Sequence, residues 1–179
     1  REMKEELKSF RFNPHVAQLK QLAKILPFTL TSAQERVFRE IQADMATSRP
    51  MNRLVQGDVG SGKTVVALHA LVMACGPGCQ TALMVPTEIL AEQHYLNLAP
   101  WLRAVGLKAV LLTSGGKAKD RNETLKQLES GVAQIAIGTH ALIQKKVRFA
   151  NLGLVIVDEQ HKFGVLQRKT LLEKGYRPD

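Results

Sequence analysis

Cysteine, aromatic residues and long hydrophobic runs are all scarce in this sequence. Only 2 of the 179 residues are Cys and 5% are aromatic. Two cysteines are too few for a disulfide-stapled scaffold. The longest apolar-rich stretch, Val65–Cys75, contains His69 and is shorter than the ~20 residues that a membrane helix needs. With 45% hydrophobic residues, the chain is also too apolar to be disordered. These exclusions leave a globular domain with its own hydrophobic core as the expected class of protein.

Acidic residues are outnumbered by basic ones, 16 Asp and Glu against 25 Lys and Arg, which gives a formal net charge of +9. This balance favours a polyanionic partner, although charge alone does not identify it. The length suits one α/β domain. The first residue is Arg1, and residues 1–12 contain three Glu and fit neither a secretory signal nor a transit peptide. We therefore expect the chain to be a piece of a longer protein.

Beyond residue 53, short β-rich runs alternate with segments of helical spacing. This alternation predicts right-handed crossovers and a three-layer α/β fold, with a mostly parallel central sheet and helices on both faces. The apolar run Leu152–Val157 has the composition of a doubly buried central strand. The expected strands are Arg53–Gln56, Thr81–Val85, Ala109–Thr113, Gln134–Gly138 and Leu154–Asp158, and the expected helices are Lys63–Ala74, Glu88–Arg103 and Asp120–Ser130.

Two helices are expected ahead of this alternating region. A helical lead-in ends at Pro27, and we expect residues 1–27 to link residues 28–179 to a domain upstream. The second helix is expected to start at Thr31, whose hydroxyl can accept from the backbone of Gln34 while the Gln34 side chain reaches back in a capping box. The apolar positions are Leu19, Leu22, Ala23 and Leu26 in the first helix and Val37, Ile41 and Met45 in the second.

A glycine-rich segment between an expected strand and an expected helix fills every fixed position of the phosphate-binding pattern G-x-x-x-x-G-K-[ST]. Glycines allow successive N–H groups to point at a phosphate, and the helix N-terminus adds a positive dipole end. Lys63 would neutralise the β- and γ-phosphates, and Thr64 would offer its hydroxyl to Mg²⁺. The sequence therefore predicts a nucleoside triphosphate site at Gly57, Asp58, Val59, Gly60, Ser61, Gly62, Lys63 and Thr64.

Two carboxylates follow the last expected strand, at Asp158 and Glu159. The carboxyl end of a strand is where α/β sheets place ligands, so Asp158 is a candidate Mg²⁺ ligand. Glu159 is a candidate base, or orienting group, for a water that attacks the γ-phosphate. A solvated acidic turn is the alternative for the pair alone. The histidines, including His161, lack zinc-ligand spacing, and no Asn-Lys-x-Asp motif of a GTPase is present.

Two further turns at strand ends could contact phosphate. Pro86-Thr87 and Gly138-Thr139-His140 present hydroxyl and N–H groups without any means of reading base identity. A plain helix N-cap at Thr87 and an ordinary strand-to-helix turn at Gly138 are the alternatives. Trp101 is expected in the core, and Cys75 and Cys79 are expected to be free thiols.

Taken together, these motifs resemble those of superfamily 2 helicases and translocases, in their first RecA-like domain. The resemblance implies ATP and Mg²⁺ as cofactors, with Gln160 and His161 relaying the nucleotide state alongside Lys63 and Glu159. Gln34 would contact adenine and Phe28 would stack on or near it, although a cap at Gln34 and a hydrophobic staple at Phe28 explain both residues equally well. The implied DNA-backbone contacts are Pro86, Thr87, Thr113, Ser114, Gly115, Gly138, Thr139 and His140.

Within that superfamily, the residues of these motifs most resemble those of the helicases that regress forks and migrate Holliday junctions in DNA recombination and repair. Transcription-repair coupling translocases are the alternative. The resemblance implies forked or branched DNA as the partner, and a second RecA-like domain and an upstream wedge domain in the same protein. It also implies a monomeric bacterial protein of the cytoplasm and nucleoid, with no membrane partner. Without the second domain's arginine finger, we expect this chain to bind Mg²⁺·ATP weakly and to hydrolyse it little.

Basic residues also cluster outside these motifs. A solvated surface is the default reading of such clusters. The cluster after the Gly138 turn is the one best placed to help hold DNA, and it consists of Lys145, Lys146 and Arg148.

Overall fold

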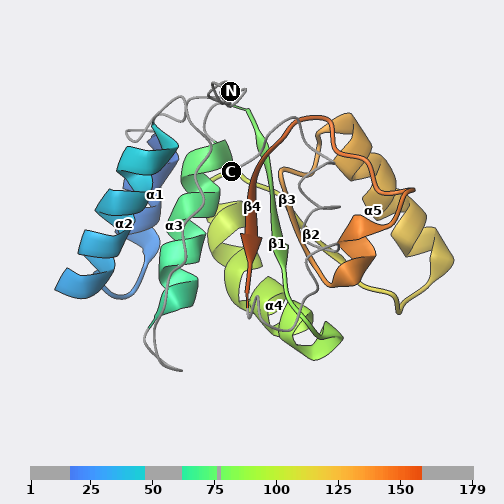
Figure 1. Ribbon diagram of the computed structural model, residues 1–179, viewed down its shortest axis with the longest axis horizontal. Coiled ribbons are helices and arrows are strands. Elements are labelled where there is room, and N and C mark those ends of the chain that lie inside the picture. Colours follow the sequence, from blue (N-terminus) through green and yellow to red (C-terminus); the bar gives the residue numbers. More distant parts are fainter. Residues whose placement is uncertain (1–16, 47–61, 76–77, 159–179) are drawn as a thin grey trace, which may run out of the picture.

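The computed structural model describes residues 17–46, 62–75 and 78–158, and within them it contains a four-stranded parallel sheet in the order β2-β3-β1-β4 (Figure 1). The strands are β1 (Gln80–Met84), β2 (Ala109–Leu112), β3 (Ile135–Gly138) and β4 (Leu152–Val157). The helices are α1 (Ala17–Ile25), α2 (Ser32–Met45), α3 (Lys63–Cys75), α4 (Glu88–Ala104), α5 (Ala118–Ser130) and the 3₁₀ turn η1 (His140–Ile143).

The predicted α/β fold is confirmed, and the four described strands and the helices α3, α4 and α5 begin and end within two residues of their predicted bounds. The predicted strand Arg53–Gln56 lies outside the described residues. The prediction of double burial for Leu152–Val157 is right only for its first half, because Leu152–Leu154 are buried whereas Val155–Val157 are half-buried. Within the described residues β4 pairs with β1 alone, which leaves its other edge without a described strand.

Alternation along the strands divides the core into two layers. Leu83 and Ile135 belong to the layer built with α1, α3 and α4, whereas Met84 and Ala136 belong to the layer built with α5 and η1. Helices therefore cover both faces of the sheet, as the right-handed crossovers require (Figure 1). No helix in the described part of the chain is long and apolar enough to cross a membrane.

The start of α2 has the predicted capping box. Thr31 Oγ1 accepts from the Gln34 N–H at 3.2 Å, and Gln34 Oε1 accepts from the Thr31 N–H at 2.9 Å. The buried stripe differs in one position, since Phe38 is buried and Val37 only half-buried. The Phe38 ring packs against His69 of α3 at 5.1 Å between centroids, whereas Ile41 and Met45 are buried as predicted.

Both cysteines are free and buried. Burial raises the pKa of the Cys75 thiol to about 12 and that of Cys79 to about 11, from an ordinary 9.0. Because the folded values exceed the unfolded value, the neutral thiols stabilise the fold fully below pH 9, and this contribution is lost as the pH rises from 9 toward 11 and 12.

We therefore expect the folded chain to resist a thiol reagent such as DTNB at pH 8, and its free energy of unfolding in urea to fall between pH 9 and pH 10.5. Cys75→Ala should reduce the pH dependence. Rapid modification of both thiols in the folded chain at pH 8 would contradict this prediction.

Candidate functional site

The four described strands end in register at one edge of the sheet, toward which the arrows of β1 and β4 point in Figure 1. Met84 pairs with Val157 and Gly138, and Gly138 pairs with Leu112. Three hydrogen bonds continue the ladder just beyond the strands, from the N–H groups of Val85, Thr139 and Asp158 to Gly138, Leu112 and Met84, at 2.9, 3.3 and 2.9 Å. The turns that follow the strands therefore form one row along this carboxyl edge.

The described end of the phosphate-loop sequence lies at the start of α3. Gly62 has a φ of +79°, which favours glycine, and Lys63 is the exposed first residue of the helix. The first N–H groups of an α-helix have no partner within the helix, and with the helix dipole they favour an anion at this end. Thr64 is half-buried beside Lys63, and residues 57–61 lie outside the described part of the chain.

Gln34 meets this loop end. A Cβ added to Gly62 would overlap the amide nitrogen of Gln34, so the two residues are in close contact only because residue 62 has no side chain. The Gln34 side chain thus caps α2 through Oε1 while its Nε2 end lies against the phosphate-loop sequence. The cap and a role beside the nucleotide, which the sequence left as alternatives, are geometrically compatible.

Phe28 packs against α4. Its ring meets Trp101 edge-on at 6.1 Å between centroids, near the end of α4, and it is 41% exposed. Trp101 is half-buried and packs against the core, in agreement with the core prediction for this residue. Phe28 therefore has an aromatic partner inside the fold, and its predicted stacking near adenine stays a prediction.

Asp158 lies one residue beyond β4, and its carboxylate is held by a histidine. His94 Nε2 of α4 lies 3.2 Å from Asp158 Oδ2, and the side chains are 15% and 36% exposed. Sequence reasoning missed this contact, because 64 residues separate the two. The available signal was the polar His94 at helical spacing from Ala91 and Leu98, which are both buried. Glu159, Gln160 and His161 lie outside the described residues.

The turns after β1 and β3 use their threonines for local structure. Thr87 is the N-cap of α4, and its hydroxyl accepts from the Leu90 N–H at 3.2 Å. Thr139 is 1% exposed and its hydroxyl accepts from Ala141, so His140, which is exposed, is the residue that this turn presents to solvent. Pro86 is half-buried beside the exposed Thr87.

Gly138 allows the two neighbouring strands to approach at this edge. A Cβ at residue 138 would overlap the carbonyl oxygen of Leu112, the same oxygen that accepts from Thr139. The turn after β2 then continues through Thr113, Ser114 and Gly115. Ser114 Oγ lies 3.4 Å from His140 Nε2, which joins this turn to the one after β3. The edge therefore carries three neighbouring turns, and α3 begins at the same end of the sheet (Figure 1).

Residues 31–177 match the DEAD/DEAH box helicase family. The chain belongs to this family. It is 51% identical to the ATP-dependent DNA helicase RecG of Synechocystis sp. over 177 residues, an alignment that covers 99% of this chain and 21% of the relative. It is 56% identical to RecG of Bacillus subtilis over 162 residues, an alignment that covers 90% of this chain and 24% of the relative. The chain thus spans less than a quarter of the length of these two relatives.

Solved structures agree with this assignment. RecG bound to a three-way DNA junction aligns with a TM-score of 0.82 and 42% identity, over 96% of this chain and 23% of that one. A hypothetical ATP-dependent RNA helicase from Sulfolobus tokodaii aligns with a TM-score of 0.69 at 18% identity, over 90% of this chain and 47% of that one, and this second match shows the fold alone.

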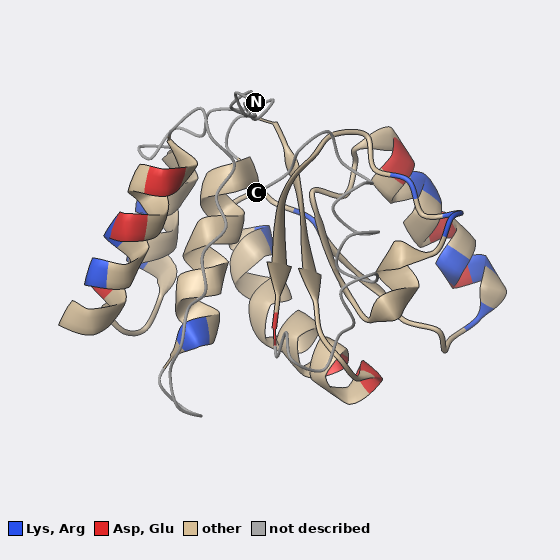
Figure 2. Ribbon diagram, in the orientation of Figure 1, with Lys and Arg blue, Asp and Glu red and all other residues tan. Residues whose placement is uncertain are grey.

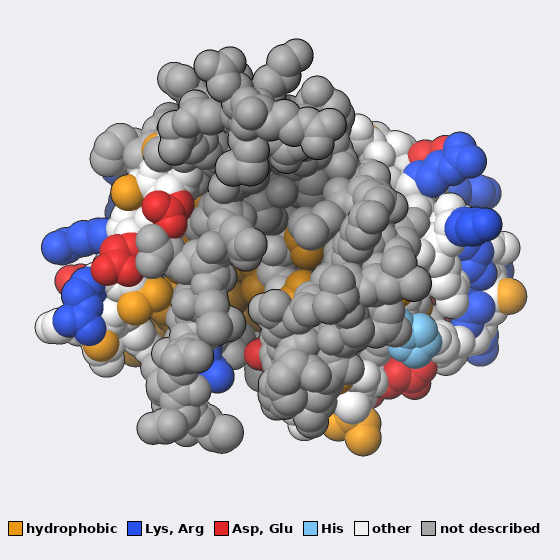
Figure 3. Space-filling model, viewed as in Figure 1, with side chains coloured by type: hydrophobic (Ala, Val, Ile, Leu, Met, Phe, Trp, Pro, Cys, Tyr) orange, Lys and Arg blue, Asp and Glu red, His pale blue; other side chains and the backbone are white. Residues whose placement is uncertain are grey.

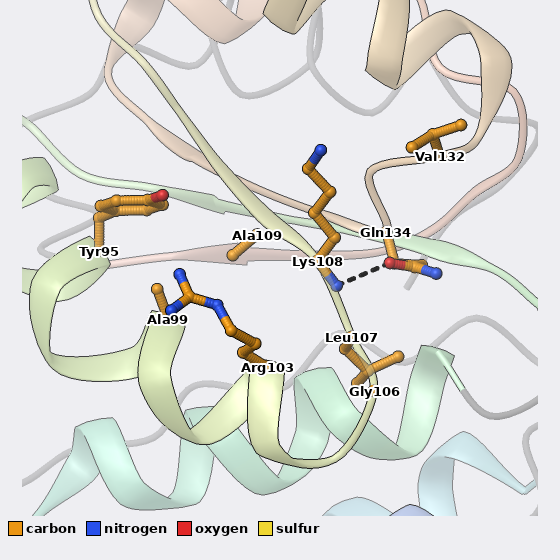
Figure 4. A pocket seen from close by; sticks show the side chains of 9 residues that line it. All are labelled: Tyr95, Ala99, Arg103, Gly106, Leu107, Lys108, Ala109, Val132 and Gln134. Carbon is orange, nitrogen blue, oxygen red and sulfur yellow. Dashed lines mark hydrogen bonds between the residues drawn. The ribbon is translucent and has the colours of Figure 1, made fainter.

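The helicase-family domain has a hollow at the opposite edge of the sheet, shown in Figure 4. It lies where β2 and β3 begin, and Tyr95, Arg103 and Lys108 line it. The Lys108 N–H donates to Gln134 Oε1 at 2.8 Å, and this hydrogen bond joins the segments that lead into the two strands (Figure 4). The hollow is thus separated from the strand-end turns by the length of the strands.

Lys and Arg side chains gather over α5 and the neighbouring segment, at the right of Figures 2 and 3. Acidic side chains are interspersed along the same helix, for example Asp120 and Glu123. This mixture is typical of a solvated face. Lys145, Lys146 and Arg148 are exposed after η1, and their predicted help in holding DNA stays a prediction.

His94 and Asp158 offer a direct test of coupling inside this helicase-family domain. We expect the single variants His94→Ala and Asp158→Ala and the double variant to show a coupling free energy of about 0.5–1.5 kcal/mol in urea unfolding, the usual contribution of one partly exposed hydrogen bond. Strict additivity of the two single substitutions would show that the contact contributes nothing.

Proposed function

We propose that this chain is the ATP-binding motor domain of an ATP-dependent DNA helicase that remodels branched DNA, by fork regression and Holliday junction migration in recombination and repair. The arrangement that carries the proposal is the shared sheet edge. The start of α3, Asp158 and the turns after β1, β2 and β3 all lie on it, so a nucleotide and a nucleic-acid backbone would bind on one rigid platform. The similarity to RecG, one structure of which holds a three-way DNA junction, supports DNA as the substrate.

The residues at this edge fit ATP and Mg²⁺. Mg²⁺ prefers oxygen ligands and usually combines one or two carboxylates with substrate phosphates and water. Asp158 supplies a carboxylate, Thr64 supplies a hydroxyl, and the described residues contain no group of three or more His, Cys, Asp or Glu that would hold a metal without the nucleotide. Mg²⁺ held by these groups would supply positive charge to the β- and γ-phosphates.

The protein's own groups divide the remaining work. Lys63 pairs with the phosphates together with Gly57, Asp58, Val59, Gly60, Ser61 and Gly62 of the loop, and Gln34 contacts adenine. Glu159 orients the attacking water, and Gln160 and His161 pass the nucleotide state to the DNA-contacting turns. The contact between Asp158 and His94 ties the end of β4 to α4, whose first turn is one of those turns. DNA would be held through its phosphates, without base readout.

We further propose that residues 28–179 form the first RecA-like domain and residues 1–27 a helical link to an upstream wedge domain. A second RecA-like domain would supply the arginine finger, and ATP would close the two domains on each other. The whole protein would act as a monomer in the bacterial cytoplasm, at the nucleoid.

A comparison of DNA substrates tests the proposal. In the protein that carries this chain, we expect ATP hydrolysis to be stimulated more by a forked or three-way junction than by a linear duplex of equal length and composition, and the junction to be converted to unwound or regressed products only with ATP. Equal stimulation by the linear duplex would contradict the branched substrate. Absence of ATP hydrolysis with every DNA would contradict the motor function itself.

A further inference from the structure

The turn between β2 and α5, residues 113–116, is held from two sides by side chains of two helices. On one side, Glu88 of α4 accepts from the Gly115 N–H at 3.1 Å. On the other side, Arg121 of α5 donates from Nη2 to the carbonyl oxygens of Ser114 at 2.6 Å and Gly115 at 3.2 Å. Two opposite charges, 33 positions apart in the chain, thus hold the peptide unit between Ser114 and Gly115, and Arg121 also holds the carbonyl oxygen of Gly115.

The geometry around this turn is tight. A Cβ on Gly115 would lie 3.3 Å from Glu88 Oε2, closer than side chains usually approach, so glycine lets the carboxylate reach the backbone. Arg121 is half-buried, and its Nε is buried without a hydrogen-bond partner in the described part of the chain. Burying a guanidinium N–H without a partner costs free energy, which the two charge-assisted bonds from Nη2 offset.

These contacts set the charge that the turn presents. Carbonyl oxygens repel a phosphate, and Arg121 covers those of Ser114 and Gly115 with a positive group. Glu88 would also repel a nucleic-acid backbone, but its carboxylate is engaged by the Gly115 N–H and lies in the first turn of α4, where the helix dipole offsets its charge. A turn that would otherwise oppose an anion is thereby made able to accept one.

We propose that Glu88 and Arg121 are positioning residues that fix the 113–116 turn in the conformation that binds the nucleic-acid backbone. The inference rests on the proposed function, because it assigns these residues to the DNA-binding edge. Glu88 follows the N-cap Thr87, and Ser114 contacts His140, so the same set of contacts joins the turns after β1, β2 and β3. Displacing one turn would then disturb the whole row.

Binding of a fluorescein-labelled oligo-dT to the chain, followed by anisotropy, separates geometry from charge at Arg121. Arg121→Ala is expected to weaken binding about tenfold, and Arg121→Lys to recover it only in part, because an ammonium lacks the planar guanidinium fork. Lys119→Ala is the matched control, since it removes the same charge from an exposed position in the same helical turn. It should change affinity no more than about twofold.

At Glu88, the loss of the charge and the loss of the anchor should change DNA affinity in opposite directions. Removing a negative charge near a DNA track should by itself tighten binding, as in the matched exposed control Glu92→Ala. Glu88→Ala is instead expected to weaken binding, because the turn loses its anchor. Glu88→Gln keeps an Oε1 acceptor for Gly115 and should bind at least as tightly as the unmodified chain.

Hydrogen exchange of the Gly115 amide without DNA reports on the anchor independently of DNA binding. Protection is expected in the unmodified chain and in Glu88→Gln and Glu92→Ala, and its loss is expected in Glu88→Ala. The proposal is overturned if the Glu88 and Arg121 variants bind oligo-dT as their controls do. A different outcome is that the unmodified chain does not bind oligo-dT although the Gly115 amide shows the expected exchange pattern. That result would overturn the proposal that this edge binds DNA, and with it the proposed role of the two residues.

Discussion

Lys63→Ala is expected to weaken binding of Mg²⁺·ATP to this chain by about 10- to 100-fold, as a lost charge-assisted contact to phosphate implies. Lys63 is exposed at the first position of α3, beside Gly62, where the N-terminal end of the helix dipole already favours an anion. In the protein that carries this chain, the same substitution should abolish DNA-stimulated ATP hydrolysis. Titration with a fluorescent ATP analogue measures the first effect, and phosphate release measures the second.

Lys20→Ala on α1 provides the matched control, since it also removes an exposed lysine but from a different helix. It should leave nucleotide affinity within about twofold of the unmodified chain, as is usual for a solvated surface charge. Equal losses in the two variants would mean that net charge, rather than the phosphate-loop position, determines affinity. Unchanged affinity in Lys63→Ala would exclude the nucleotide site at the start of α3.

Gly138→Ala is expected to destabilise the chain by about 1–3 kcal/mol, the usual cost of overpacking. The added Cβ would overlap the Leu112 carbonyl oxygen, and this oxygen belongs to the backbone, so the β2–β3 pair itself must separate. The turns after both strands should move with it, and we expect oligo-dT affinity to fall about tenfold, equivalent to about 1.4 kcal/mol. Urea unfolding and fluorescence anisotropy measure the two effects.

Gly106→Ala is a control that lowers the stability of the fold at a position away from the proposed DNA-binding edge. Gly106 has a φ of +81° and open space around it, so alanine there should cost about 1–2 kcal/mol through backbone conformation alone. The residue precedes β2 at the opposite edge of the sheet, and its substitution should leave oligo-dT affinity unchanged. If both variants lost affinity in proportion to their lost stability, the close approach at Gly138 would have no specific part in DNA binding.

The sequence was sufficient for features that depend on neighbouring residues. The alternation of β-rich and helical segments predicted the α/β class, and the spacing of Thr31 and Gln34 predicted the capping box that the structure contains. These patterns could be read because each arises from local backbone geometry. The phosphate-loop pattern is equally local, and Lys63 does begin α3 as that pattern requires.

Long-range features could not be predicted in this way. The parallel order β2-β3-β1-β4 depends on how the crossover helices pack on the sheet. The residues of a strand do not by themselves predict which strand will pair with it. The contact of His94 with Asp158 and the contacts of Glu88 and Arg121 with the 113–116 turn join helix residues to strand ends, and they arise only once the sheet has formed. The burial of Phe38, whose ring packs against His69 of α3, likewise depends on a contact between two helices.

The central claim is that the carboxyl edge of the sheet binds the nucleic-acid backbone, and hydrogen exchange with and without oligo-dT tests it most directly. We predict slower exchange of amides in residues 85–90, 113–117 and 138–142, with little change in residues 122–130 of α5. Protection confined to α5, with the strand-end turns unchanged, would contradict the claim.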